Sequence, residues 1–308
     1  MNKSSSNFGT TLLFLLFYWC CVANLMGQNF NKFTVHEIDA IDRKKQNSSF
    51  DLTFLDTKLS SKRIVLLGEP THGEGNVLVA KTNLIRHLHK KLGFTVIAFE
   101  SSFYDMFMAR RQYLTNRNFE TIKLEIYPIW TLSDECVELF DYLAQEKEIK
   151  VVGFDNQISG KMAEFLVDSL QSYTEKNKID KESIDWENIE DVVLFMSENY
   201  KFPPHKDYEN FIKNLDDIKQ KLRKKSKDIT ERDFWILMIE NLHNLATDYY
   251  KNNPNSKDTI TFKAKDSNLR DFQMAQNLFY LLNLYKDEKF ICWGGKYPFF
   301  KKHRTFGE

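Results

Sequence analysis

Three stretches of the sequence are apolar without polar alternation, and each ends on an acidic residue. They are RIVLLGE, ending at Glu69, FTVIAFE, ending at Glu100, and IKVVGFD, ending at Asp155. A continuous apolar run rich in β-branched residues predicts a strand buried on both faces, as in a parallel sheet. A fourth run near the end of the sequence, KFICWGG, predicts another such strand without the terminal acid.

The segments between these runs have helical periodicity. Residues 76–93 place apolar side chains at helical spacing and end on a glycine, as many helices do. Residues 134–147 form a second amphipathic pattern, whose shared apolar face comprises Val137, Leu139, Phe140 and Leu143. From about residue 160 to about residue 250 the pattern is long, helical and charged. This order predicts an α/β fold, with a parallel-sheet core flanked by helices and an all-helical insertion.

The first thirty residues have the pattern of a targeting segment. Lys3 precedes a short apolar stretch, TLLFLLFYWCCVA, and small residues follow it. This predicts a secretory signal peptide over residues 1–27, with the α/β domain covering residues 28–308. The alternative is a transmembrane anchor, but about 20 apolar residues are normally needed to span a bilayer. We therefore expect export to the periplasm or the extracellular space, without stable membrane insertion after cleavage.

The charge balance limits the possible partners of the protein, and the cysteine content limits its possible disulfides. The 308 residues include 43 basic and 43 acidic side chains, for a formal net charge of zero. That balance argues against a nucleic-acid partner and against an anionic membrane surface. After cleavage of the signal only Cys136 and Cys292 remain. Because both lie in apolar periodic segments, we expect buried thiols rather than a disulfide.

The acids that end the first three apolar runs predict a site. Ligands of open α/β sheets bind just outside the carboxyl ends of the strands, so Glu69, Glu100 and Asp155 are expected to converge on one cleft. Close carboxylates repel one another and need a cation, a shared proton or a metal. His72, three residues after Glu69, is a candidate general base beside them. The alternative is that His72 only caps a helix beginning near Asn76.

Four ordered segments resemble the erythromycin esterase family. LGEPTHGEGN and the following GFTVIAFE are similar to that family's G-E-x-x-H-G and G-F-x-x-x-A-F-E patterns. VVGFDNQ (residues 151–157) resembles its G-F-D-x-Q, and LRDFQMAQNLFYLL (residues 269–282) resembles its R-D-x-x-M-A-x-N helix. The resemblance extends from about Ile64 to Trp293.

The resemblance implies an α/β core with a helical excursion and a hydrolase that opens a lactone or another ester by activating water. His72 is then the general base, and Glu69 and Glu100 are the catalytic carboxylates that orient and support it. The substrate-binding or supporting positions are Lys81, Glu135, Asp155 and Arg270. The implied partner is a small-molecule ester or lactone, with no essential metal or other cofactor. Macrolides are the family's named substrate, and nothing in this sequence specifies one.

The sequence departs from the family pattern at several positions. The family usually has W-A-H-N-A-H after the fourth strand, where this sequence has Gly295 and Pro298 in place of the histidines. Lys81 and Ser133 stand where arginines are common. Family members usually continue well beyond residue 308, so either His303 takes a missing role or this is a truncated or frameshifted form. We expect weak or absent esterase activity from the chain as it stands.

Two other functions are open on the sequence alone. The missing histidines favour a degenerate, non-catalytic protein that binds a ligand in the same cleft. The strand-end acids also suit a metal-dependent hydrolase. Its ligands would be Glu69, His72, Glu100 and Asp155. One imidazole and three carboxylates suit Mn or Fe better than structural zinc.

Overall fold

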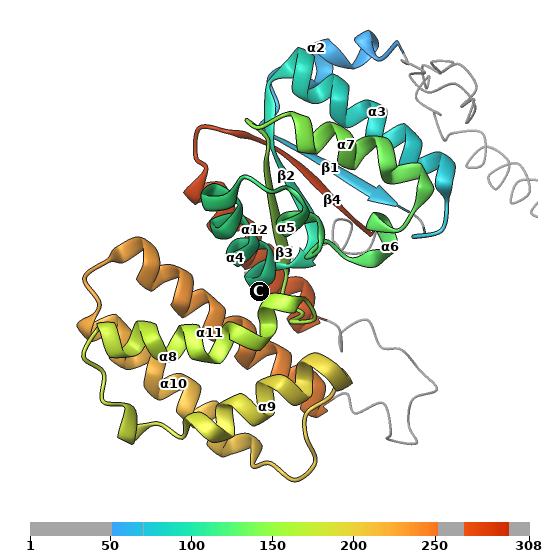
Figure 1. Ribbon diagram of the computed structural model, residues 1–308. Helices are drawn as coiled ribbons and strands as arrows, with labels where there is room; N and C mark the ends of the chain where they lie inside the picture. The colour runs from blue at the N-terminus through green and yellow to red at the C-terminus, as the bar shows by residue number, and fades with distance from the viewer. Residues whose placement is uncertain (1–50, 70, 252–267, 296–308) are drawn as a thin grey trace, which may run out of the picture. The chain divides into compact units, whose positions relative to one another are not determined.

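The computed structural model describes residues 51–69, 71–251 and 268–295 (Figure 1). Its sheet has four strands, all parallel, in the order β1-β4-β2-β3. They are β1 (Ile64–Glu69), β2 (Phe94–Ser102), β3 (Lys150–Asp155) and β4 (Lys289–Gly295). This confirms the predicted parallel α/β sheet, including its fourth strand.

The strands differ in how deeply they are buried. β2 lies between β4 and β3 and is buried along nearly its whole length. In β1, at the edge of the described sheet, Ile64 is 39% exposed and Leu66 is 48% exposed. The expectation that all of these strands are buried on both faces is therefore wrong for β1, because the face that carries Ile64 and Leu66 is left partly uncovered. β2 also continues past Glu100 to Ser102, so this acid lies within the strand and not at its end.

Helices α3 (Gly75–Leu92) and α7 (Val137–Gln145) cover one face of the sheet (Figure 1). Gly93 follows α3 with a φ of 70°, and its backbone N–H bonds to the last turn of the helix. That left-handed conformation costs a glycine little, so the predicted end of this helix is confirmed. The predicted apolar face of α7 is wrong at Val137, which is 52% exposed because it opens the helix.

The opposite face of the sheet packs against helices that come from distant parts of the sequence. Phe290 and Cys292 of β4 share one apolar core with α4 (Phe103–Asn116), α12 (Asn268–Leu284) and the helices between β3 and α12. Those intervening long helices are α8 (Leu166–Lys176), α9 (Trp186–Asn199), α10 (Tyr208–Lys225) and α11 (Ile229–Lys251). The shorter elements are η1 (Thr53–Leu55), α2 (Asp56–Leu59), α5 (Glu120–Lys123), α6 (Pro128–Thr131), η2 (Asp134–Cys136), η3 (Lys161–Phe165) and η4 (Lys181–Ser183).

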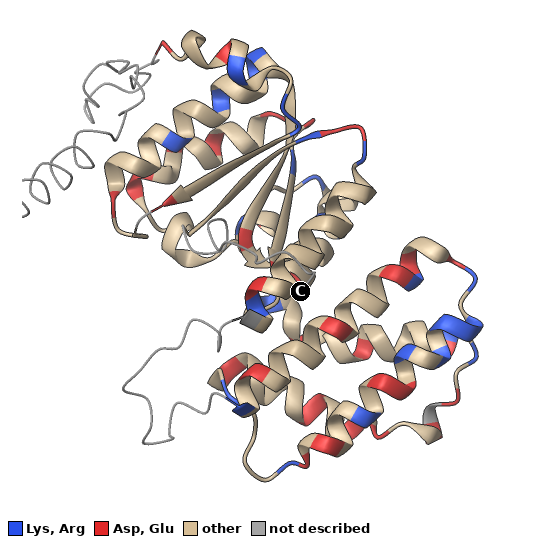
Figure 2. Ribbon diagram, turned by 180° about the vertical axis from the view of Figure 1, so that it is seen from behind, with Lys and Arg blue, Asp and Glu red and all other residues tan. Residues whose placement is uncertain are grey.

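Charged residues follow the division between core and surface. Figure 2 shows acidic and basic residues mixed along the helices, while the strands carry few charged residues except near their ends. Cys136 and Cys292 are buried free thiols, as expected, and burial raises the pKa of each to about 12. No helix in the described ranges is both long and apolar enough to cross a membrane. The proposed signal peptide, residues 1–27, lies outside the described residues.

Candidate active site

The carboxylate of Glu69, at the end of β1, is held by three donors. Its Oε1 lies 2.6 Å from Nδ1 of His72 and accepts a hydrogen bond from the indole of Trp130 at 3.1 Å. Its Oε2 accepts a hydrogen bond from the Lys81 ammonium at 3.0 Å. The side chain of Glu69 is fully buried, so these groups replace the water that the carboxylate loses in the folded protein.

The chain path from β1 into α3 brings these groups together. His72 lies in the loop between the two elements, and Lys81 lies on the buried side of α3. Lys81 also contacts the face of the Trp293 ring on β4, 4.4 Å from its centroid. Burial lowers the pKa of Lys81, and the adjacent Glu69 carboxylate opposes this shift. A cation beside the acid at this depth stabilises the ionised carboxylate.

The side chain of His72 is 46% exposed, although its partner is buried. Its ring packs edge-on against Trp130, with centroids 5.9 Å apart. Among the described residues Glu69 provides its one hydrogen-bond partner. The residue that precedes α3 is Glu74, and no side chain caps the helix there. The interpretation of His72 as a helix cap is therefore wrong.

Arg270, on α12, connects the other two acids, Glu100 and Asp155. Its Nε and Nη2 atoms donate to the two oxygens of Asp155, at 3.0 and 2.6 Å, in a bidentate pair. The same Nη2 lies 3.5 Å from Oε1 of Glu100. The Asp155 side chain is fully buried, and one third of the Arg270 side chain is exposed. Arg270 thus provides the positive charge that two neighbouring carboxylates require.

The backbone of β4 lies beside both Glu69 and Glu100. The N–H of Gly295 donates to Oε2 of Glu100 at 2.6 Å, and Gly295 pairs in register with Glu69 on β1. Burial raises the pKa of the Glu100 carboxyl, an effect that Gly295, Arg270 and His72 partly oppose. A backbone amide therefore contacts Glu100 at a position where the family pattern has a histidine. Pro298 and His303 lie outside the described residues.

Tyr127 connects the two groups from the other side and was missed by the sequence analysis. Its hydroxyl donates to Oδ2 of Asp155 at 3.0 Å. Its ring stacks on Trp130, with centroids 6.3 Å apart and an angle of 16° between the planes. Burial and the neighbouring Asp155 carboxylate raise the pKa of Tyr127 well above its usual range, which keeps the phenol protonated. The available signal was its position in YPIW, three residues before Trp130.

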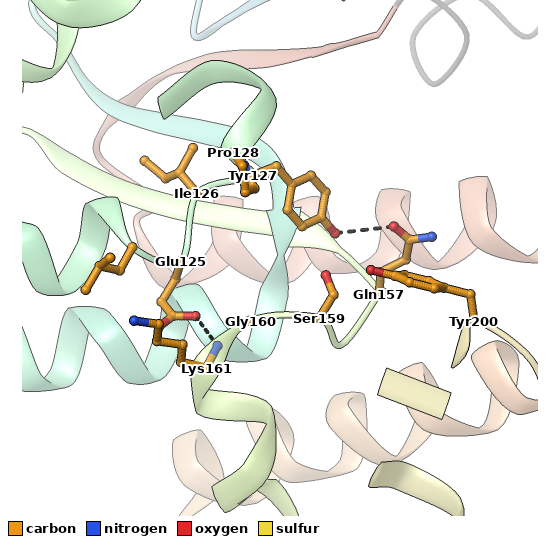
Figure 3. Close-up of a pocket in the computed structure, with 10 residues that line it drawn as sticks. Glu125, Ile126, Tyr127, Pro128, Gln157, Ser159, Gly160, Lys161 and Tyr200 are labelled. Atoms are coloured by element: carbon orange, nitrogen blue, oxygen red, sulfur yellow. Dashed lines mark hydrogen bonds between the residues drawn. The ribbon is translucent and has the colours of Figure 1, made fainter. Parts of the chain in front are cut away.

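A cavity of about 440 Å³ opens beside Tyr127 (Figure 3). Its volume lies in the range of small-molecule sites. The Tyr127 hydroxyl faces the side-chain oxygen of Gln157 at 3.5 Å. The wall consists of Leu124, Glu125, Ile126, Tyr127, Pro128, Gln157, Ser159, Gly160, Lys161 and Tyr200. Apolar and hydrogen-bonding groups therefore surround a space that adjoins the partner of Asp155.

Two buried acids beside this cavity follow no apolar run, so the strand-end pattern could not identify them. Glu125 accepts the backbone N–H of Lys161 at 2.9 Å, and Asp105 accepts that of Gly160 at 3.2 Å. They hold the backbone where η3 begins, at the start of the helical segment. Burial raises the pKa of Asp105 to about 6 and that of Glu125 to about 7.

Glu135 lies near the start of α3. Its Oε2 accepts the Ser133 hydroxyl at 2.8 Å, and a Cβ added at Gly75 would collide with the Glu135 carboxylate. This carboxylate therefore packs against the helix that follows His72. Among the described residues, no three of the four side chains considered as metal ligands bring their ligand atoms within 4.8 Å of one another. Lys81 and Arg270 lie against these acids instead.

The sequence matches the model of one known protein family. The model of the erythromycin esterase family matches residues 89–295, which is more than half of the chain. The chain belongs to this family. The match includes Glu100, Asp155 and Arg270 and begins after Glu69 and His72.

Individual relatives agree with this assignment. The Bacillus subtilis (strain 168) protein named "Putative hydrolase YbfO" is 31% identical over 294 residues, covering 83% of this chain and 60% of YbfO. A succinoglycan biosynthesis protein has a similar structure, with a TM-score of 0.57, 15% identity, and coverage of 83% of this chain and 62% of that one. A mutant of the erythromycin esterase EreC in its open conformation also has a similar structure. Its TM-score is 0.56 and its sequence identity is 17%, over 79% of this chain and 63% of that one. At these identities the two structures show a shared fold. The chain spans 60%, 62% and 63% of the lengths of these three proteins.

Proposed function

We propose that this member of the erythromycin esterase family hydrolyses a small-molecule ester or lactone, with His72 as the base that activates water. The observation that carries the proposal is the 2.6 Å contact between Nδ1 of His72 and Oε1 of Glu69. A buried carboxylate that accepts Nδ1–H leaves Nε2 with a free lone pair. Nearly half of the His72 side chain is exposed, so the ring is accessible to water.

The proposed reaction follows from that tautomer. Water attacks the carbonyl carbon of the ester while Nε2 of His72 takes its proton. The tetrahedral intermediate then collapses, and the departing alkoxide receives this proton from the imidazolium. Glu69 orients the ring throughout and stabilises its positive charge, as the acid does in a catalytic triad.

The supporting residues divide between two tasks in this proposal. Lys81 and the indole of Trp130 fix Glu69, so that the acid keeps its position and its charge. Arg270 holds the Asp155 carboxylate and lies against Glu100, so its positive charge keeps these two acids together beside the proposed reaction centre. The cavity beside Tyr127 would receive the part of the substrate that does not react.

The test is a hydrolysis assay of the purified chain on a panel of activated aryl esters and macrolactones. We expect slow turnover, below roughly 1 per second, because Gly295 provides only a backbone amide where the family pattern has an imidazole. An added chelator should leave the rate unchanged, because the base in this mechanism is an imidazole and not a metal-bound hydroxide. A rate that disappears with chelator would favour the metallohydrolase.

A ligand-binding role without catalysis is the second candidate, and the contact between Gly295 and Glu100 favours it. In that case the cavity would bind an ester without turning it over. Calorimetric binding together with a hydrolysis rate equal to the uncatalysed one would identify this role. We also propose export of the chain, on the pattern of residues 1–27 alone. N-terminal sequencing of the secreted protein would test it.

A further inference from the structure

His89, Glu146 and Glu148 gather at the end of α3 that lies away from His72. His89 belongs to the last turns of α3, and the two glutamates lie in the turn between α7 and β3. One ligand atom of each residue lies within 4.8 Å of the others. Because an α-helix rises 1.5 Å per residue, His89 is about 20 Å along α3 from its start beside the His72 loop. This cluster is therefore separate from the candidate active site.

The distances in the cluster suit a shared metal ion. Nε2 of His89 lies 3.3 Å from Oε1 of Glu148. Two ligands of a tetrahedral zinc ion, each about 2.1 Å from the metal, lie about 3.4 Å from one another. The imidazole and the carboxylate thus have the separation expected of two ligands on one ion.

A neighbouring phenol can orient the imidazole for this role. Nδ1 of His89 lies 2.6 Å from the hydroxyl oxygen of Tyr142. Burial raises the pKa of Tyr142 above its usual range, so the phenol stays protonated and neutral. A histidine that donates Nδ1–H to such an oxygen presents the Nε2 lone pair to a metal, as metal-bound histidines commonly do. Only 8% of the His89 side chain is exposed, which limits its rotation.

The turn that carries the two glutamates is closed by its own backbone. The N–H of Ile149 donates to the carbonyl of Glu146 at 3.1 Å. The carboxyl ends of α3 and α7 both lie here, and the negative ends of helix dipoles attract cations. Lys90 is the competing cation, 3.6 Å from Oε1 of Glu146, and its side chain is 59% exposed. An exposed lysine can leave this position at little cost when a divalent ion binds.

We propose that His89, Glu146 and Glu148 bind one divalent transition-metal ion, zinc first, which clamps the end of α3 to the α7–β3 turn. One imidazole nitrogen and two carboxylate oxygens fill three positions of a tetrahedral site and leave the fourth to water. The site does not depend on the proposed hydrolysis, because it lies at the other end of α3.

The test is calorimetric titration of the metal-stripped full chain with zinc chloride at pH 7.5, together with thermal unfolding. We expect one zinc per chain with a dissociation constant of roughly micromolar order. The unfolding midpoint should rise as zinc is added, because zinc binds the folded chain. His89→Ala should weaken binding at least tenfold and abolish the rise.

His87→Ala is the matched control. His87 lies on the same helix and is paired with the carboxylate of Asp56 at 2.6 Å, without a third ligand near it. This variant should bind zinc like the unmodified chain. If His89→Ala fails to fold, Glu146→Gln combined with Glu148→Gln replaces it, since both amides keep the shape of the turn. Zinc binding that survives these changes, or that never reaches one ion per chain, would show that the cluster is only an ion pair.

Discussion

Nδ1 of His72 lies 2.6 Å from Oε1 of Glu69, and the other oxygen of the same carboxylate accepts a hydrogen bond from Lys81 at 3.0 Å. A half-exposed imidazole is thus fixed by a buried acid, which is itself paired with a buried cation. Because the three groups differ in burial, their effects on stability and on chemistry can be measured separately.

Replacing Glu69 with Gln should destabilise the protein strongly. The change leaves the Lys81 ammonium buried without its counter-charge, which costs about 3–5 kcal/mol in the free energy of unfolding. Urea denaturation measures this loss. The double variant Glu69→Gln, Lys81→Met should recover at least half of it, since both charges are then removed together. If the free energy of unfolding of Glu69→Gln lies within 1 kcal/mol of that of the unmodified chain, the Glu69–Lys81 pair does not contribute as a buried ion pair.

Arg270 should tolerate neither Lys nor Met. Lysine keeps the charge but cannot reproduce the two-point contact with Asp155, so Arg270→Lys should cost about 1–3 kcal/mol of unfolding free energy. Arg270→Met leaves the Asp155 carboxylate buried without a partner cation and should cost about 3–5 kcal/mol. The control is Arg223→Met, which removes an exposed ion pair with Glu240 and should change stability by less than about 1 kcal/mol. Equal losses of unfolding free energy in Arg270→Met and Arg223→Met would argue against a buried contact between Arg270 and Asp155.

The strand-end acids were predictable because three apolar runs end near a carboxylate and parallel strands end on the same side of a sheet. That pattern places Glu69, Glu100 and Asp155 near the same edge of the sheet. Their partners depended on tertiary packing. Arg270 is 115 residues from Asp155 in sequence, and its bidentate contact exists only because α12 packs beside β3.

Glu125 should make folding stability depend on pH near neutrality. Its pKa of about 7 in the folded chain exceeds the usual 4.5, so the folded state favours the protonated acid. This contribution is fully present below about pH 4.5 and is lost as the pH rises through 7. Relative to Glu125→Gln, the free energy of unfolding should therefore fall by on the order of 3 kcal/mol between pH 4 and pH 8.

Denaturation in urea at half-unit pH intervals measures this difference. Gln can still accept the backbone N–H of Lys161, so the variant removes the titration and keeps the contact. The matched control is Glu182→Gln, because Glu182 is an exposed acid in the short helix η4. The difference in unfolding free energy between Glu182→Gln and the unmodified chain should not change with pH. A flat difference for Glu125→Gln as well would show that this acid titrates normally.

Gly160→Ala should destabilise the start of the helical segment. A Cβ at this position would lie 2.7 Å from Cγ of Asp105 and would also collide with the Glu125 carboxylate. Overpacking of this kind costs about 1–3 kcal/mol. Gly73→Ala is the control, since a Cβ there has nothing within 4 Å and should change stability little. Thermal unfolding of both variants tests this, and equal midpoints would contradict the close approach at Gly160.

The polar residues around the site were harder to predict from sequence than the strands. His87 and His89 resemble surface residues in sequence, yet their side chains are 11% and 8% exposed because each packs against an acid from another segment. Tyr127 and Asp105 follow no periodic pattern in the sequence. Their buried contacts form only when the loop after β3 folds back onto α4 and the segment after α5. Hydrophobic periodicity records which face of an element is buried, whereas these polar contacts depend on the partner that a distant segment brings.

The most direct test of the account is the hydrolysis rate of His72→Ala on the best ester found in the substrate panel. The account predicts a fall in kcat/KM of roughly 10²- to 10⁴-fold, the usual contribution of a general base. The free energy of unfolding should stay within about 1 kcal/mol, because this side chain is 46% exposed. His87→Ala, a histidine equally close to an acid, should keep the full rate. A His72→Ala protein that hydrolyses the ester as fast as the unmodified chain would contradict the role of His72 as the base.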